Sequence, residues 1–177
     1  NSYTSKSDNE AILSVATTSG QIASGNYNVD VTQVASSHKI ASSAFASNSD
    51  ALGLSGTLDI TIDNETLNLN VNTADSLSNI RDNINASANN PGLTANILKV
   101  SDANGDDEYR LVLTSNETGE ACEITVGGTL AEDLDLTTTL STAQNAKFTF
   151  NGFPVERSSN TISDVLEGVT FHLNGGI

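Results

Sequence analysis

The sequence predicts a mainly β fold of the α+β class, in which an antiparallel β domain carries an inserted β-rich unit with one short helix. Many short segments alternate apolar and polar residues, which is the period of a half-buried strand. Only 16% of the 177 residues are charged, and polarity comes from Thr, Ser, Asn and Asp rather than from the long side chains that surface helices favour. Helical spacing of apolar residues is clear at one place, residues 77–84.

The first part of the chain predicts four strands. The apolar run at 11–16 predicts a short strand, and the alternation of Tyr27, Val29 and Val31 predicts a second. Small and polar residues follow, for which we expect loop with some extended structure. Residues 58–62 and 67–71 then alternate on both sides of a short polar turn, which predicts a β-hairpin.

A short helix is predicted after this hairpin. Leu77, Ile80 and Ile84 fall at i, i+3 and i+7 and form one apolar stripe. Arg81 lies off that stripe, so we expect it to face solvent and reach acidic neighbours. The turn signal Asn90-Pro91-Gly92 ends the segment. Three residues before the stripe offer N-capping oxygens: Thr73, Asp75 and Ser76.

Further strands are predicted towards the C-terminus. Residues 94–100 and 109–114 read as two strands around a polar turn, whereas 127–146 show no assignable pattern. Asn151-Gly152 is a strong hairpin signal between residues 148–150 and a return strand that begins at Val155. Two last elements complete the prediction, a single helical turn at 164–166 capped by Ser163 and a closing strand at 169–173.

The order of these elements suggests a divided domain. The strand near the N-terminus and the C-terminal hairpin and strand read like two halves of one β domain. We therefore expect residues 1–50 and 141–177 to form a discontinuous β domain, with 51–140 as the inserted β/α unit. A single continuous domain is the alternative.

Charge excludes two classes of partner. The formal net charge is −15, and nucleic-acid binding requires clustered cations that displace counterions from phosphates. Anionic lipid would be repelled for the same reason, and no apolar run approaches the roughly 20 residues of a spanning helix. We expect neither nucleic acid nor membrane as a partner. The seven cations occur singly: Lys6, Lys39, Arg81, Lys99, Arg110, Lys147 and Arg157.

The turn at residues 102–107 resembles half of a calcium loop. Asp102, Asn104 and Asp106 stand at its first, third and fifth positions, where oxygen ligands belong. Asp107 replaces the required Gly and Leu113 replaces the final Glu, so a solvated hairpin turn is the better interpretation.

Other candidate chemistry has plainer explanations. The acidic runs 106–108 and 132–133 lie in polar segments, whereas an acid/base pair requires burial and opposed pKa shifts. His38 and His172 lack a second metal ligand nearby, and Cys122, the single cysteine, reads as a buried small apolar residue. Gly127-Gly128 lacks the Lys-Ser/Thr of a phosphate loop. We therefore expect no enzyme and no catalytic, cofactor or metal site.

Several segments together resemble one known family, the bacterial flagellar filament cap proteins (hook-associated protein 2). The middle segments resemble an insertion motif that cap proteins share with flagellins, and the last ones are more specific to the cap family. Residues 120–142 match nothing recognisable. The segments are, in order, 25–35, 39–45, 56–58, 76–85, 91–95, 110–119, 143–152 and 157–170.

The resemblance implies the head region of a secreted structural subunit. Such a subunit forms the cap at the flagellum tip with other copies of itself, after export through the flagellar secretion channel, and promotes flagellin folding and insertion. It implies helical, coiled-coil flanks outside this sequence, and host surface glycans or mucin as further partners. A head fragment with this charge is expected to be a monomer or weak oligomer in dilute solution.

Two other classes of function are alternatives. An adhesin or receptor-binding β module of another bacterial appendage would share the acidic, Thr- and Asn-rich composition. A glycan-active enzyme would need two carboxylates about 5–9.5 Å apart in a cleft, and the sequence offers no such pair.

Overall fold

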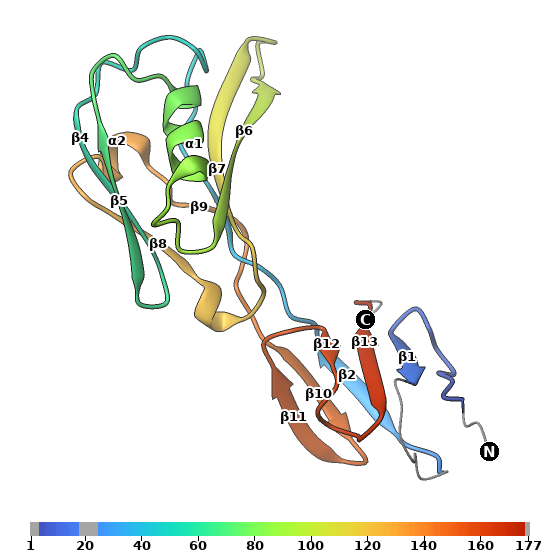
Figure 1. Ribbon diagram of the computed structural model, residues 1–177. Helices are drawn as coiled ribbons and strands as arrows, with labels where there is room; N and C mark the ends of the chain where they lie inside the picture. Colours follow the sequence, from blue (N-terminus) through green and yellow to red (C-terminus); the bar gives the residue numbers. More distant parts are fainter. Residues whose placement is uncertain (1–3, 18–24, 176–177) are drawn as a thin grey trace. The chain divides into compact units, whose positions relative to one another are not determined.

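The computed structural model describes residues 4–17 and 25–175, which form two compact units (Figure 1). Unit 1 takes the described residues of Asn1–Ser36 together with Thr118–Glu120 and Gln144–Ile177. Unit 2 takes Ser37–Glu117 and Ala121–Ala143. A short 3-10 helix spans Glu120–Cys122. Each unit has its own apolar core, so the two are described separately.

Unit 1 contains two three-stranded antiparallel sheets (Figure 1). The first has the order β1-β13-β12, with β1 at Leu13–Thr17, β12 at Thr161–Ile162 and β13 at Val169–Leu173. The second has the order β11-β10-β2, with β2 at Val29–Gln33, β10 at Ala146–Phe150 and β11 at Phe153–Arg157. The core between them includes Val31, Phe148, Ile162, Val169, Phe171 and Leu173.

The hairpin β10–β11 confirms the signal in the sequence. Asn151 and Gly152 both have positive φ (48° and 84°), as a type I′ turn requires. The strand near the N-terminus lies in the same sheet as this hairpin, because β2 runs antiparallel to β10 with Val31 opposite Phe148.

The predicted helical turn at residues 164–166 is wrong. These residues form bends that lead into β13. The Asp164 carboxylate accepts hydrogen bonds from the Nε of Arg157 at 3.0 and 3.1 Å instead of serving a helix.

Unit 2 combines two sheets with two helices. The four-stranded sheet has the order β6-β7-β3-β9 and the three-stranded sheet has the order β5-β4-β8. The first comprises β3 at Lys39–Ala41, β6 at Leu93–Ser101, β7 at Asp107–Ser115 and β9 at Thr138–Ser141. The second comprises β4 at Gly56–Ile62, β5 at Glu65–Val71 and β8 at Ile124–Gly127. The helices are α1 at Leu77–Ala86 and α2 at Ala131–Leu134.

Helix α1 forms for the reasons that the sequence indicates. Its three stripe residues, Leu77, Ile80 and Ile84, are fully buried against the core. Ser76 is the N-cap: its Oγ accepts the N–H of Asn79 at 3.2 Å, and the Asn79 side chain accepts the N–H of Ser76 at 3.0 Å. Arg81 lies off the stripe with 31% of its side chain exposed and pairs with Asp82 at 2.8 Å.

The mainly β prediction is confirmed, with more strands than expected. The described residues add β3, β8, β9 and β12 to the nine strands read from the sequence, and α2 to the one helix. The unassigned stretch 127–146 holds α2 and β9. Within the described part of the chain, no helix has the length and apolar character needed to cross a bilayer.

Residues 37–50 were predicted to belong to the discontinuous β domain. They lie in unit 2 because β3 pairs with β7 and β9. Compactness does not itself establish which part folds alone, so the division at residues 50 and 141 stays a prediction.

Candidate functional site

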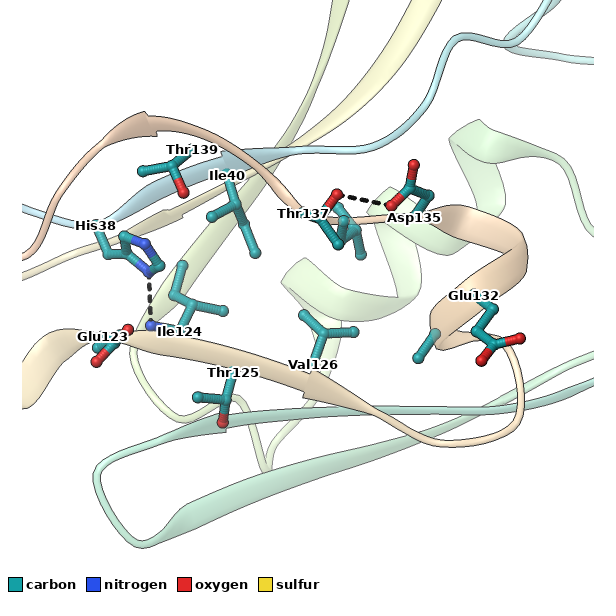
Figure 2. A pocket seen from close by; sticks show the side chains of 12 residues that line it. His38, Ile40, Glu123, Ile124, Thr125, Val126, Glu132, Asp135, Thr137 and Thr139 are labelled. Carbon is teal, nitrogen blue, oxygen red and sulfur yellow. Dashed lines mark hydrogen bonds between the residues drawn. The ribbon is translucent and has the colours of Figure 1, made fainter.

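A hollow of about 480 Å³ opens in unit 2 beside His38 (Figure 2). Strands β3, β8 and β9 and helix α2 supply its walls. Ile40 and Ile124 give it an apolar floor, and its carboxylates come from Glu123, Glu132 and Asp135.

His38 is buried, with 7% of its surface exposed, and joins three strands. Its Nδ1 accepts the N–H of Ile124 at 2.8 Å, which ties the start of β8 to the start of β3 (Figure 2). The backbone N–H of His38 donates to Ser115 Oγ at 2.9 Å, and the backbone N–H of Ser115 donates to the His38 carbonyl oxygen at 2.9 Å. Because Nδ1 accepts, this bond assigns the ring proton of the neutral form to Nε2.

The carboxylates of the hollow do not combine with His38 into a metal centre. Asp135 follows α2 with φ of 46°, and its Oδ1 accepts the hydroxyl of Thr137 at 2.7 Å (Figure 2). Among the described residues, no three His, Cys, Asp or Glu side chains come together in a way that could hold a metal ion. The hollow is lined by carboxylates, and its histidine accepts a backbone hydrogen bond that holds β8 in place.

Asp102 lies in the hairpin turn between β6 and β7. Its Oδ1 accepts the backbone N–H groups of Asp106 and Asn104, both at 2.8 Å. The first of these bonds has the largest part in lowering the pKa of the Asp102 carboxyl. Asp102 Oδ1, which would be a ligand in a calcium loop, therefore holds the turn closed through these two hydrogen bonds.

The acidic run after this turn forms surface ion pairs. Asp107 pairs with Lys99 at 2.8 Å, and that hydrogen bond raises the pKa of Lys99. Glu108 pairs with Arg110 at 3.3 Å. The other run, Glu132-Asp133, lies in the first turn of α2.

The remaining candidates lie apart from one another. His172, on β13 in unit 1, has its Nδ1 3.2 Å from the Thr161 hydroxyl. Cys122 is half-buried rather than buried as predicted. Desolvation still raises the pKa of its thiol, which disfavours the thiolate that a nucleophile requires. Gly128 has φ of +90°, and a Cβ there would collide with the carbonyl oxygen of Thr57, so close packing against β4 requires this glycine.

Sequence reasoning missed two asparagines that cap a strand edge. Asn85 donates from Nδ2 to the Ala95 carbonyl and accepts the Ala95 N–H at Oδ1, both at 2.8 Å. Asn90 does the same for Leu93, with both distances 2.9 Å. Asn90 was visible only as part of a turn signal, because the capping role depends on which side of β6 faces outward.

Two families match the chain. The family described as "Flagellar hook-associated protein 2 C-terminus" matches residues 143–177, and the "Flagellin hook IN motif" matches residues 52–117. Residues 120–142, which carry no part of the resemblance seen in the sequence, lie outside both matches.

Relatives extend the match over nearly the whole chain. The A-type flagellar hook-associated protein 2 of Pseudomonas aeruginosa is 32% identical over 96% of this chain and 40% of its own length. The flagellar hook-associated protein 2 of Escherichia coli K12 is 33% identical over 84% of this chain and 34% of its own length. The chain thus spans about two fifths or less of these relatives.

A solved structure agrees in fold and in extent. The D2-D3 domains of the flagellar cap protein FliD from Escherichia coli match with a TM-score of 0.78 and 33% identity, over 92% of this chain and 87% of that one. The resemblance seen in the sequence is confirmed: this chain belongs to the flagellar hook-associated protein 2 family, which comprises structural cap proteins of the flagellum rather than enzymes.

Proposed function

We propose that this chain is the head part of a flagellar cap subunit that promotes flagellin folding and insertion at the filament tip. The observation that carries the proposal is the match to the FliD D2-D3 domains, which covers 87% of that structure. Flagellin and other copies of the full subunit are its proposed partners, and the outside of the cell at the flagellum tip is its proposed location.

The chemistry of the chain is compatible with a structural role. His38 holds backbone in place, and the Asp102 carboxylate closes a turn. The net charge of −15 favours neither nucleic acid nor anionic lipid as a partner. The adhesin alternative, including binding of host glycans or mucin, rests on composition alone, so family membership favours the cap.

A replacement experiment tests the proposal. In Escherichia coli lacking its flagellar hook-associated protein 2, the head of that protein would be exchanged for this chain and the hybrid expressed. We expect filaments and swimming to return and free flagellin in the medium to fall, because a working cap retains the flagellin that it inserts.

The matched control is the same hybrid with Ile80→Asp, which places a charge in the core of unit 2. This variant should be exported without restoring filaments. A stable, exported wild-type hybrid that leaves flagellin in the medium at the level of the deletion strain would contradict the proposal.

A further inference from the structure

Strand β6 lies at the edge of the four-stranded sheet, and only its first half is capped. Asn90 and Asn85 bind both outward-facing backbone groups of Leu93 and of Ala95. Outward-facing groups recur at every second residue of an antiparallel edge strand. The next outward positions are therefore Ile97 and Lys99.

The second half of this edge is open. Within the described part of the chain, the outward N–H and C=O groups of Ile97 and Lys99 form no hydrogen bond. The hydrogen bonds of β7 confirm that the backbone groups of Lys99 point outward. Tyr109 lies opposite Lys99, but its N–H and C=O bind Phe45 on the other side of β7 and not Lys99. The open edge is defined here as Ile97–Ser101.

Another edge in the molecule is closed by different means. In β11, Pro154 stands next to the closing pair of a two-residue hairpin, opposite Thr149. That position is not hydrogen-bonded to β10, so the nitrogen of Pro154 faces the open side, where a residue other than proline would offer a donor. Proline on an edge strand is a known means of blocking strand addition.

The open edge also exposes apolar side chains. Leu98 and Val100 are 42% and 37% exposed and share the face of β6 that points away from the core, while Ile97 packs against the core. The edge strand β5 differs, because its exposed residues are polar: Glu65, Thr66, Asn68 and Asn70. Unsatisfied backbone and apolar side chains thus coincide at Ile97–Ser101, which is the combination that strand addition uses.

Acidic residues surround this edge. Asp107 and Glu108 lie opposite Ser101 and Val100 on β7, and Asp102 and Asp106 close the turn. Among the described residues, Lys99 pairs with Asp107 and Arg110 pairs with Glu108. A strand added to β6 would lie roughly 10 Å from β7, about one Debye length at 0.1 M salt, so it would feel an attraction for positive charge that salt weakens.

We propose that the open edge Ile97–Ser101 binds an extended, cationic segment of a partner protein as an added β-strand. Backbone hydrogen bonds to Ile97 and Lys99 would hold the segment, apolar residues of the segment would cover Leu98 and Val100, and its Lys or Arg residues would meet the carboxylates. A second copy of this chain is disfavoured as the occupant because each copy carries −15. Binding at this edge does not require the proposed cap function.

Amide hydrogen exchange in the 177-residue chain tests the proposal. The probe is a short synthetic peptide of alternating Lys and Val with capped ends. We expect it to slow exchange of the Ile97 and Lys99 amides by at least about tenfold near saturation. The Leu98 and Val100 amides, which already face β7, should change little. A peptide with methyl groups on alternate backbone nitrogens should not protect, and a Glu/Val peptide should bind at least about tenfold more weakly.

The matched variants are Lys99→Pro and Lys99→Ala. Both remove the ion pair with Asp107, but only proline removes the outward N–H. Lys99→Pro should bind the Lys/Val peptide at least about tenfold more weakly than Lys99→Ala. If Lys99→Pro fails to fold, the N-methylated peptide makes the same test on the wild-type chain.

Several results would overturn the proposal. These are absence of protection at millimolar Lys/Val peptide, protection spread away from residues 97–101, or equal binding of the N-methylated or Glu/Val peptide. Protection of Ile97 and Lys99 that grows with protein concentration alone would make a second copy the occupant.

Discussion

Replacing His38 tests whether this buried ring serves the backbone. In His38→Ala the N–H of Ile124 loses its acceptor at 2.8 Å, and a space opens beside Ile40 and Ile124. The two hydrogen bonds that the backbone of residue 38 makes to Ser115, one to its Oγ and one from its N–H, do not involve the ring. The substitution therefore removes the hydrogen bond from the ring to β8 together with the packing of the ring.

The expected cost follows from these contacts. A buried N–H left without a partner costs about 1–3 kcal/mol, and the loss of ring packing adds to it. The neighbouring hollow lets water approach the N–H of Ile124, which limits the cost of leaving that N–H without its partner. We expect His38→Ala to lower the free energy of unfolding of unit 2 by about 2–4 kcal/mol.

His38→Asn is the matched control, because its Oδ1 can take the place of Nδ1 as acceptor. It should cost about 1 kcal/mol. Urea unfolding gives the free energies, and exchange of the Ile124 amide gives the local bond: the rate should rise in His38→Ala and stay near wild type in His38→Asn. Equal destabilisation in both variants, with equal exchange at Ile124, would refute the role given to Nδ1.

Four further outcomes are expected. Ile84→Ala should cost about 2–5 kcal/mol in urea unfolding and Arg81→Glu at most about 1 kcal/mol, and the reverse order would contradict the packing of α1. Gly128→Ala should lower the thermal midpoint, since a Cβ meets the Thr57 carbonyl; an unchanged midpoint would contradict this. Backbone donors lower the pKa of Asp102, so its support of the turn is present above the ordinary value of 3.8 and lost as pH falls through the lower folded value. A pKa of 3.8 or higher for Asp102, measured by NMR titration, would refute this. We propose that unit 2 is a separate domain, so residues 37–143 made alone should unfold cooperatively, and a gradual loss of signal would count against it.

Local patterns in the sequence predicted the elements that local interactions define. The stripe and cap of α1, the hairpin β4–β5 and the Asn151-Gly152 turn all involve residues close together in the chain. Strand β3 gave no such signal, since it has three residues in a Ser- and Ala-rich stretch. It is a strand because β7 and β9 pair with it from far along the chain, and periodicity does not carry that information.

The roles of single side chains were harder to predict for the same reason. His38 was read as a lone histidine in a polar stretch, and the sequence contains nothing that brings Ile124 to its ring. The turn residue Asp102 was easier, because its hydrogen-bond partners lie two and four residues away. Distance along the chain explains the case of His38, whereas Asn90 was missed although Leu93 lies three residues away, because its role depends on which side of β6 faces outward.

The abundance of asparagine has a structural explanation beyond loops. Asn85 and Asn90 each bind the N–H and C=O of one β6 residue, and Asn160 in unit 1 does the same for Ala35 at 2.7 and 2.8 Å. A carboxamide reproduces the donor and acceptor of a neighbouring peptide group, so one side chain can end a sheet without another strand. Because such a cap acts at single residues, a strand can be closed over part of its length and open over the rest. Where Asn85 and Asn90 stop, at Ala95, the open edge of β6 begins, which makes the position of these amides the feature that decides where a partner strand can bind.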